Sequence, residues 1–367
     1  MKVCHITSVH KWNDVRIFEK ECVSLAKEGF DVSLVSVNGH EGIFKGVNVY
    51  SVKSRKSGRF YRMTKTVYDV YLKAKSLNAD IYHIHDPELI PVAIKFFKSG
   101  KIVFYDAHED LNLQVKSKHY IPKIFRNTIS FITEIVLKVL SKNCSAVVAA
   151  TPSIYDYFTK QGANSIVLFN FPIISELYID FKDKKSDEFS ICYAGGIMES
   201  RGIFQLLDAM NGSPFKLHLA GNYSPASLRS ELVSKPSWSN VIEYGFLNRK
   251  EILEMYKKCN VGIVTLLPAP NYIDAYPVKM FEYMAAGLAI IASDFPLYKS
   301  IIEENNCGIC LDPTNPQKIN EAIFYLSQNK DLVKAMSLNG QRLISSKYNW
   351  DVESLKLINL YNNYKKD

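Results

Sequence analysis

Two carboxylates and a lysine surround the start of one predicted helix. Asp274 and Glu282 are separated by seven residues, and between them a proline-rich loop becomes a helix at Pro277 and Val278. A helix N-terminus offers unpaired N–H groups and the positive end of the helix dipole, which suit a diphosphate. Glu282 lies one turn further on, on the side of Val278 and Lys279. Its carboxylate can therefore accept a hydrogen bond from a ribose hydroxyl beside the phosphates.

A glycine-rich loop follows another predicted strand. Gly195 and Gly196 come directly after it, and Arg201 precedes a helix that begins near Gly202. A guanidinium can bind phosphate oxygens through two parallel hydrogen bonds. The helix dipole disfavours a cation at a helix start, so the position of Arg201 favours a role in binding an anion.

Histidines follow two predicted strands in the first half of the chain, in the segments HIHDPEL (83–89) and YDAHEDL (105–111). The second segment places His108 between Asp106 and Glu109, either of which can orient its ring. The first loop, TSVHKWNDV (7–15), is also polar and follows a strand. These loops supply a candidate site for an acceptor molecule, made of His10, Asn13, Asp14, Arg16 and His85.

Short apolar runs that alternate with amphipathic stretches must position these side chains. Such alternation predicts parallel sheets covered by helices, and it occurs twice. Ligands of such sheets bind at the carboxyl ends of the strands. We therefore expect an α/β protein of two doubly wound Rossmann-like domains that face each other across a cleft. The expected parts are an acceptor domain (1–170), a linker (171–188), a donor-binding domain (189–345) and a C-terminal helix that crosses back to the first domain (346–367).

The segment NYIDAYPVKMFEYMAAGLAIIASD (271–294) resembles the E-x7-E region of retaining glycosyltransferases of the GT-B fold, family 4. YAGGIMESRG (193–202) is similar to the family's V-G-R-x4-K-G motif, and the two histidine segments resemble its H-x-H-D and H-D/E motifs. The resemblance implies that Glu282 binds the donor ribose and that His108 faces the donor sugar. Asp274 replaces a glutamate that contacts this sugar. Arg201 stands at the family's lysine position, and Gly196 stands where the family has an arginine.

The resemblance implies three catalytic residues: His108, Arg201 and Asp274. Lys279 is a candidate replacement for the missing arginine. The expected donor-binding set is Gly196, Arg201, Gly245, Leu247, Asp274, Tyr276, Pro277, Val278, Lys279 and Glu282.

The expected reaction moves a sugar from a nucleoside diphosphate sugar to a glycan acceptor, with retention of the anomeric configuration. No D-x-D motif follows a predicted strand, so we expect neither a metal nor another cofactor, and a UDP-sugar is the favoured donor. Two alternatives remain. A sugar-nucleotide 2-epimerase would turn over the donor alone, and a non-catalytic partner subunit of a membrane glycan-assembly complex would not turn over at all.

Charge is unevenly distributed along the chain. Residues 1–170 carry 24 Lys and Arg against 15 Asp and Glu, a net charge of +9, whereas the remainder carries −1. An anionic membrane surface and a lipid-linked oligosaccharide acceptor would suit the apolar stretch 121–140 and the cluster of Lys53, Arg55, Lys56, Arg59, Arg62 and Lys65. Two alternatives stay open: the cluster is a solvated face, and the stretch 121–140 packs in the core of the first domain. No basic recognition helix suggests nucleic acid. Seven scattered cysteines and an N-terminus unlike a signal peptide predict a cytoplasmic protein at the inner face of the plasma membrane.

Overall fold

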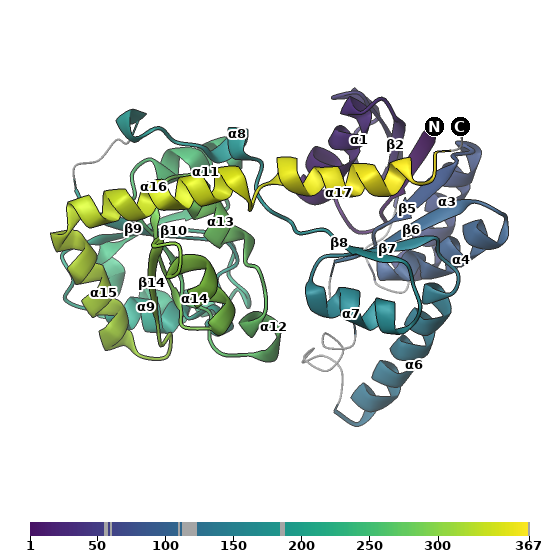
Figure 1. Ribbon diagram of the computed structural model, residues 1–367. Helices are drawn as coiled ribbons and strands as arrows, with labels where there is room; N and C mark the ends of the chain where they lie inside the picture. The colour runs from purple at the N-terminus through teal and green to yellow at the C-terminus, as the bar shows by residue number, and fades with distance from the viewer. Residues whose placement is uncertain (55–57, 59–60, 109–110, 112–122, 184–187, 366–367) are drawn as a thin grey trace. The chain divides into compact units, whose positions relative to one another are not determined.

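The chain folds into two compact units in a computed structural model that describes residues 1–54, 58, 61–108, 111, 123–183 and 188–365. One unit comprises Met1–Asn170 and Asp351–Asp367, and the other comprises Phe171–Trp350. Each contains a largely parallel sheet with helices packed against it (Figure 1). The predicted fold class of two Rossmann-like α/β domains is confirmed.

The sheet of the first unit has the strand order β3-β4-β2-β1-β5-β6-β7-β8. All its neighbouring strands are parallel except β3 and β4, which are antiparallel. The order reverses between β1 and β5, so a switch point lies where these two strands end. The strands are β1 (Lys2–Ile6), β2 (Asp31–Val37), β3 (Gly42–Phe44), β4 (Val47–Val52), β5 (Ile81–Ile84), β6 (Ile102–Ala107), β7 (Ala146–Ala149) and β8 (Ser165–Val167).

The sheet of the second unit is parallel throughout its described strands, in the order β11-β10-β9-β12-β13-β14. This is the Rossmann order, and its switch point lies between β9 and β12. Strands β9, β12 and β13 are buried along their whole length because helices cover both faces. The strands are β9 (Ser190–Ala194), β10 (Lys216–Ala220), β11 (Val241–Gly245), β12 (Val261–Val264), β13 (Ala289–Ser293) and β14 (Gly308–Leu311).

Helices connect the strands in both units. Those grouped mainly with the first unit are η1 (Val15–Cys22), α1 (Val23–Lys27), η2 (Arg62–Thr66), α3 (Val67–Ser76), η3 (Pro87–Leu89), α4 (Ile90–Lys98), α6 (Lys123–Ser141), α7 (Pro152–Lys160) and α17 (Trp350–Asn362). Those of the second unit are α8 (Ile174–Leu177), η4 (Phe181–Asp183), η5 (Glu199–Arg201), α9 (Ile203–Ala209), α10 (Leu228–Val233), η6 (Pro236–Asn240), α11 (Arg249–Tyr256), α12 (Pro270–Ile273), α13 (Val278–Ala285), α14 (Pro296–Ile302), α15 (Pro316–Gln328) and α16 (Lys330–Ser346).

Two local features of the first unit are not evident from hydrophobic periodicity. The helix after the first loop begins as the π-helical η1, which Asp14 caps by accepting from the N–H groups of Arg16 and Ile17. The hairpin β3–β4 was not expected. Its turn residues Lys45 and Gly46 both have positive φ, as a two-residue type I′ turn requires.

The end of helix α17 packs on the first sheet. Tyr361 is fully buried, and the rings of Tyr361 and Tyr364 both contact Phe104 of β6, with centroids 4.9 and 5.2 Å apart. These aromatic contacts fix the last helix to the sheet of the first unit.

Candidate functional site

A pocket of about 580 Å³ lies in the second unit, where strands β9, β10 and β11 end and helix α13 begins. This is the edge of the sheet at which a doubly wound fold binds its ligand. Seven of the ten predicted donor-binding residues line it: Gly196, Arg201, Leu247, Pro277, Val278, Lys279 and Glu282.

The loop after β9 contains Gly196, which stands where the resembled family has an arginine. The Arg201 guanidinium lies against this residue, with Nη1 donating to the Gly196 carbonyl oxygen at 3.4 Å. A Cβ atom on Gly196 would lie 3.3 Å from the same nitrogen. Arg201 therefore lies directly beside position 196, and it brings a positive charge to the pocket wall.

Lys279 lies in the first turn of helix α13, at the pocket wall. Its side chain is 9% exposed, and its Nζ lies 3.8 Å from the centroid of the Tyr193 ring. Within the described part of the chain, this amine has no hydrogen-bond partner. Burial, reinforced by the charge of Arg201, lowers the pKa of Lys279 well below its usual value. The amine is thus prepared to bind an anion that enters the pocket.

Glu282 forms an ion pair inside the same pocket. The Arg249 guanidinium donates to its carboxylate at 2.5 Å and also lies 3.5 Å from Glu176. Arg249 is the first residue of α11, where Asn248 and Glu251 form a capping box. This ion pair fixes the Glu282 carboxylate at the pocket wall, where the Glu282 side chain is 14% exposed.

Three predicted donor residues do not line this pocket. Asp274 is exposed after the short helix α12, and the Tyr276 ring packs between Phe171 and Phe281. Gly245 has a φ of 68°, and its carbonyl accepts from the N–H of Gly221 at 2.8 Å. In this structure Gly245 and Tyr276 hold neighbouring backbone and side chains in place.

A second pocket, of about 470 Å³, lies in the first unit at the ends of β1 and β5. Five of the predicted catalytic and acceptor residues line it: His10, Asp14, Arg16, His85 and His108. Asn13, also predicted, is not among the lining residues. Glu109 lies outside the described residues.

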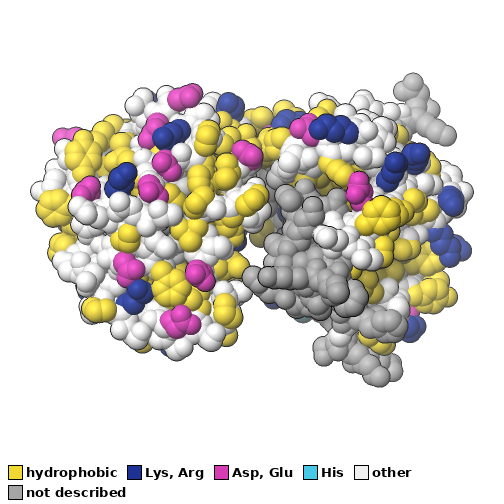
Figure 2. Space-filling model, turned by 90° about the horizontal axis from the view of Figure 1, so that it is seen from below, with side chains coloured by type: hydrophobic (Ala, Val, Ile, Leu, Met, Phe, Trp, Pro, Cys, Tyr) yellow, Lys and Arg dark blue, Asp and Glu magenta, His cyan; other side chains and the backbone are white. Residues whose placement is uncertain are grey.

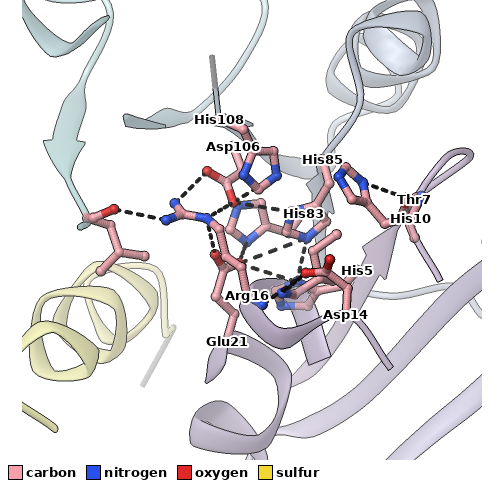
Figure 3. A network of polar contacts seen from close by, with 12 residues as sticks. His5, Thr7, His10, Asp14, Arg16, Glu21, His83, His85, Asp106 and His108 are labelled. Carbon is pink, nitrogen blue, oxygen red and sulfur yellow. Dashed lines mark hydrogen bonds and ion pairs between the residues drawn. The ribbon is translucent and has the colours of Figure 1, made fainter. Parts of the chain in front are cut away.

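Asp106 connects three of these lining side chains (Figure 3). Its buried carboxylate accepts from Arg16 at 2.8 and 3.1 Å, lies 3.2 Å from His85 Nδ1 and lies 3.4 Å from His108 Nε2. Although burial opposes ionisation, Arg16 and the two histidines hold the pKa of Asp106 well below its usual range. Burial lowers the pKa of His108 to about 4, so its imidazole is neutral at pH 7. Asp106 is therefore the ionised group that orients this wall of the pocket.

His10 and Asp86 form a second polar pair at this pocket. His10 Nδ1 lies 3.0 Å from the Asp86 carboxylate, which also accepts from the Thr7 hydroxyl at 2.7 Å and from the Ser8 N–H. These hydrogen bonds outweigh burial and lower the pKa of Asp86 to about 2. The hydrogen bond to Asp86 raises the pKa of His10, which makes its half-buried imidazole the more basic one at this wall.

Both halves of the chain match families of glycosyltransferases. Residues 175–343 match the family described as "Glycosyl transferases group 1", and residues 19–170 match "Glycosyltransferase Family 4". The chain is a GT-B glycosyltransferase. This assignment confirms the predicted enzyme class.

Relatives of this glycosyltransferase are distant in sequence. An uncharacterized glycosyltransferase of Haemophilus influenzae is 22% identical over 343 residues, 89% of each chain. An uncharacterized glycosyltransferase of Methanocaldococcus jannaschii is 23% identical over 159 residues, so the chain covers only 44% of that relative's length. A second from the same organism is 24% identical, and the chain covers 45% of its length.

Solved structures share the fold of the glycosyltransferase over nearly its whole length. Sucrose-phosphate synthase from Thermosynechococcus elongatus aligns with a TM-score of 0.77 at 15% identity, covering 99% of this chain and 98% of that one. The Anabaena protein HepE in complex with UDP-glucose aligns with a TM-score of 0.72 at 15% identity, covering 99% and 100%. WaaG, a glycosyltransferase involved in lipopolysaccharide biosynthesis, aligns at 0.68 and 14% identity, covering 96% and 98%.

Sequence reasoning missed Arg249 and Tyr361. Arg249 was recognisable as a helix-start residue from the spacing of Asn248 and Glu251, but its partner Glu282 lies 33 positions further along the chain. No pattern in the sequence joins Tyr361 to the histidines of the first unit, since the contact spans 278 positions.

Two groups of side chains have ligand atoms close enough to hold a metal ion, counted over the described residues. One comprises His5, Glu21, His83 and His85, and the other His85, Asp106 and His108. In the first group, His5 Nδ1 and His85 Nε2 already face each other across a 2.8 Å hydrogen bond. The expectation that the glycosyltransferase uses no metal stays a prediction.

Proposed function

We propose that the glycosyltransferase transfers a sugar from a nucleoside diphosphate sugar, with a UDP-sugar favoured, to a lipid-linked glycan, and that the anomeric configuration is retained. One observation carries the proposal: the pocket of the second unit combines the Arg201 guanidinium, the Lys279 amine and the start of α13 with the Glu282 carboxylate. A guanidinium, an amine that takes up a proton when an anion binds, and a helix N-terminus together suit a diphosphate. The carboxylate suits ribose hydroxyls.

The same groups support a reaction without a metal. The leaving diphosphate gains negative charge in the transition state, and fixed cations beside it lower the barrier. Among the described residues that line this pocket, Glu282 is the sole carboxylate, and Arg249 already pairs with it. The lining thus has the cations that replace a metal and lacks the free carboxylates that would bind one.

Retention is what the resemblance to family 4 implies, and the same lining bears on how it would be achieved. A covalent double displacement needs a carboxylate at the anomeric carbon, and the described lining offers none besides the paired Glu282. We therefore favour a front-face reaction, in which the leaving phosphate accepts the proton of the acceptor hydroxyl. The resemblance further implies that His108, whose imidazole is neutral at pH 7, hydrogen-bonds the donor sugar.

Helix α6 supports a membrane-bound acceptor. Sequence analysis left open whether this stretch packs in the core, yet Leu137 and Leu140 are its buried leucines, whereas Phe131, Ile132 and Ile135 are 63, 53 and 47% exposed. Lys138 and Lys142 are exposed on and just after the same helix. Figure 2, seen from the side on which α6 lies, shows hydrophobic side chains beside Lys and Arg on the first unit.

The other basic cluster contributes less than expected. Arg62 pairs with Glu88 at 2.7 Å and Lys65 with Asp69 at 2.6 Å, so their charges are partly neutralised. Arg55, Lys56 and Arg59 lie outside the described residues, and Lys53 is exposed. No described helix combines the length and the apolarity that crossing a bilayer would require. We therefore propose peripheral docking through α6 at the inner face of the plasma membrane, with a surface polysaccharide as the product.

Transfer is tested with radiolabelled UDP-, GDP- and ADP-sugars, each with and without lipid extracted from bacterial membranes. We expect label in the lipid fraction with one donor, and an anomeric coupling constant in the product that equals that of the donor. Epimerised donor without lipid would instead identify a 2-epimerase. Absence of both binding and turnover would identify a non-catalytic subunit.

Docking is tested by co-sedimentation with liposomes of neutral or anionic lipid at low and high salt. Phe131→Ser with Ile132→Ser should reduce binding more than tenfold, because burying each side chain is worth about 1.5–3 kcal/mol. The control is Phe324→Ser, since Phe324 is 54% exposed on α15 of the second unit. Equal binding by all three proteins would refute docking through α6.

A further inference from the structure

A chain of hydrogen bonds runs through the interior of the first unit, from the C-terminal helix to the acceptor-side pocket. Tyr361 Oη lies 2.8 Å from His83 Nδ1 and 3.2 Å from His5 Nε2. His5 Nδ1 lies 2.8 Å from His85 Nε2, and His85 Nδ1 lies 3.2 Å from Asp106. All five side chains are at most 1% exposed, so water does not compete for these bonds.

The partners determine where the protons lie. Asp106 is ionised and can only accept, so His85 carries its proton on Nδ1. The bond between the two rings is then made with His85 Nε2 as the acceptor and His5 Nδ1 as the donor. His5 Nε2 then accepts the Tyr361 hydroxyl proton, and the Tyr361 oxygen accepts from His83 Nδ1. His83 Nε2 is left bare, and it has no partner among the described residues.

Neighbouring groups are compatible with this arrangement of protons. Glu21 lies 3.9 Å from a nitrogen of each of His5, His83 and His85. Burial and the charge of Asp106 raise the pKa of Glu21 well above its usual value, which favours its protonated form. Arg16 lies 3.1 Å from Glu21 and binds Asp106. Burial also lowers the pKa of His5 and of His83, which keeps both rings uncharged.

We propose that Tyr361 and His5 are positioning residues, which hold the His85 proton on Nδ1 and thereby fix the Asp106 carboxylate that orients Arg16 and His108. Without the Tyr361 hydroxyl, His5 Nε2 loses its donor, and the ordinary preference of neutral histidine for a proton on Nε2 then competes with the bond from His5 Nδ1 to His85. Two bare nitrogens would then face each other between His5 and His85 until His85 exchanged tautomer and lost its bond to Asp106. The C-terminal helix thus helps to set the geometry of the acceptor-side pocket, an inference that rests on the proposed function of that pocket.

The first test compares Tyr361→Phe with Tyr364→Phe. Both rings pack on Phe104 of β6, but the Tyr364 hydroxyl donates to the Ser145 carbonyl oxygen at 2.8 Å, outside the histidine chain. Tyr361→Phe should lower kcat about three- to tenfold, the worth of one neutral hydrogen bond, and should change the acidic limb of the pH–rate profile. KM for the donor should not change. Equal effects of the two variants, or no effect of Tyr361→Phe, would overturn the proposal.

A second measurement does not depend on activity. In protein labelled with ¹⁵N only at histidine, long-range ¹H–¹⁵N spectra identify the protonated nitrogen of each ring. Neutral histidine in water prefers the proton on Nε2, whereas the chain requires His5, His83 and His85 to carry it on Nδ1. Signals are assigned from single His→Gln variants. An Nε2-protonated His85 in the native protein would refute the proposal even if transfer is observed, and the Nδ1 form would support it even if no donor were turned over.

Discussion

Lys279→Met should stabilise the free protein and weaken its binding of the donor. The native amine is buried, lies over the Tyr193 ring and has no hydrogen-bond partner in the described chain. A buried polar group without a partner costs about 1–3 kcal/mol, and methionine has a similar length without this cost. If the amine binds the diphosphate, its loss removes a charge-assisted hydrogen bond worth about 1.5–3 kcal/mol. This corresponds to a donor affinity about 10- to 150-fold lower.

The pH dependence of stability should change with the same substitution. Because the pKa of Lys279 is lowered in the folded state, the unfolded chain binds a proton below about pH 10.5 that the native amine does not hold. Native stability therefore falls as the pH is lowered from that value towards the folded pKa. Lys279→Met should remove this part of the slope.

Calorimetry tests whether the Lys279 amine binds the donor. Titration of the donor in buffers of different ionisation enthalpy should show proton uptake by the native protein and none by Lys279→Met. Lys250→Met is the matched control, because Lys250 is exposed on α11 and does not line the pocket. Unchanged donor affinity in Lys279→Met, with native-like folding, would refute the role of this amine.

Three further predictions concern the same pocket. Glu282→Ala should lower donor affinity by about 1.5–3 kcal/mol, because the ribose loses a charged acceptor; unchanged affinity in calorimetry would remove that assignment. Arg201→Ala should reduce kcat by ~10²–10³-fold, the usual effect of deleting one group that stabilises transition-state charge, with the melting temperature little changed; an unchanged kcat would assign the diphosphate charge to Lys279 and the backbone. Transfer should survive treatment with EDTA, and loss of activity that Mn²⁺ or Mg²⁺ restores would contradict the metal-free reaction.

Much of the fold was predictable because the spacing of apolar residues over a few positions indicates which strands and helices form. The strands around Gly195 and the helix that carries Glu282 follow from apolar runs and turn residues within about ten positions. The π-helical start of η1 depends on a cap by Asp14, and the hairpin β3–β4 depends on positive φ at Lys45 and Gly46. Such backbone details leave little trace in hydrophobic periodicity.

The candidate site was predictable in its residues more than in their contacts. Motif spacing identified Arg201, Lys279 and Glu282 as pocket residues. It gave no indication that Lys279 is buried over Tyr193, or that Arg249 pairs with Glu282, because these contacts depend on how distant strands end side by side. Asp274 was selected by its motif position, yet it is exposed and does not line the pocket.

The measurement that tests the central claim most directly is thermal denaturation with a panel of UDP-, GDP- and ADP-sugars at the same concentrations. A ligand that binds only the native state raises the midpoint, by an amount equivalent to about 2.7 kcal/mol at a hundred times its Kd. We predict that one nucleotide class, with UDP favoured, raises the midpoint of the native protein and has a smaller effect on Glu282→Ala and on Lys279→Met. If no nucleotide sugar raises the midpoint, or if both variants respond as the native protein does, the donor site proposed in the second unit is contradicted.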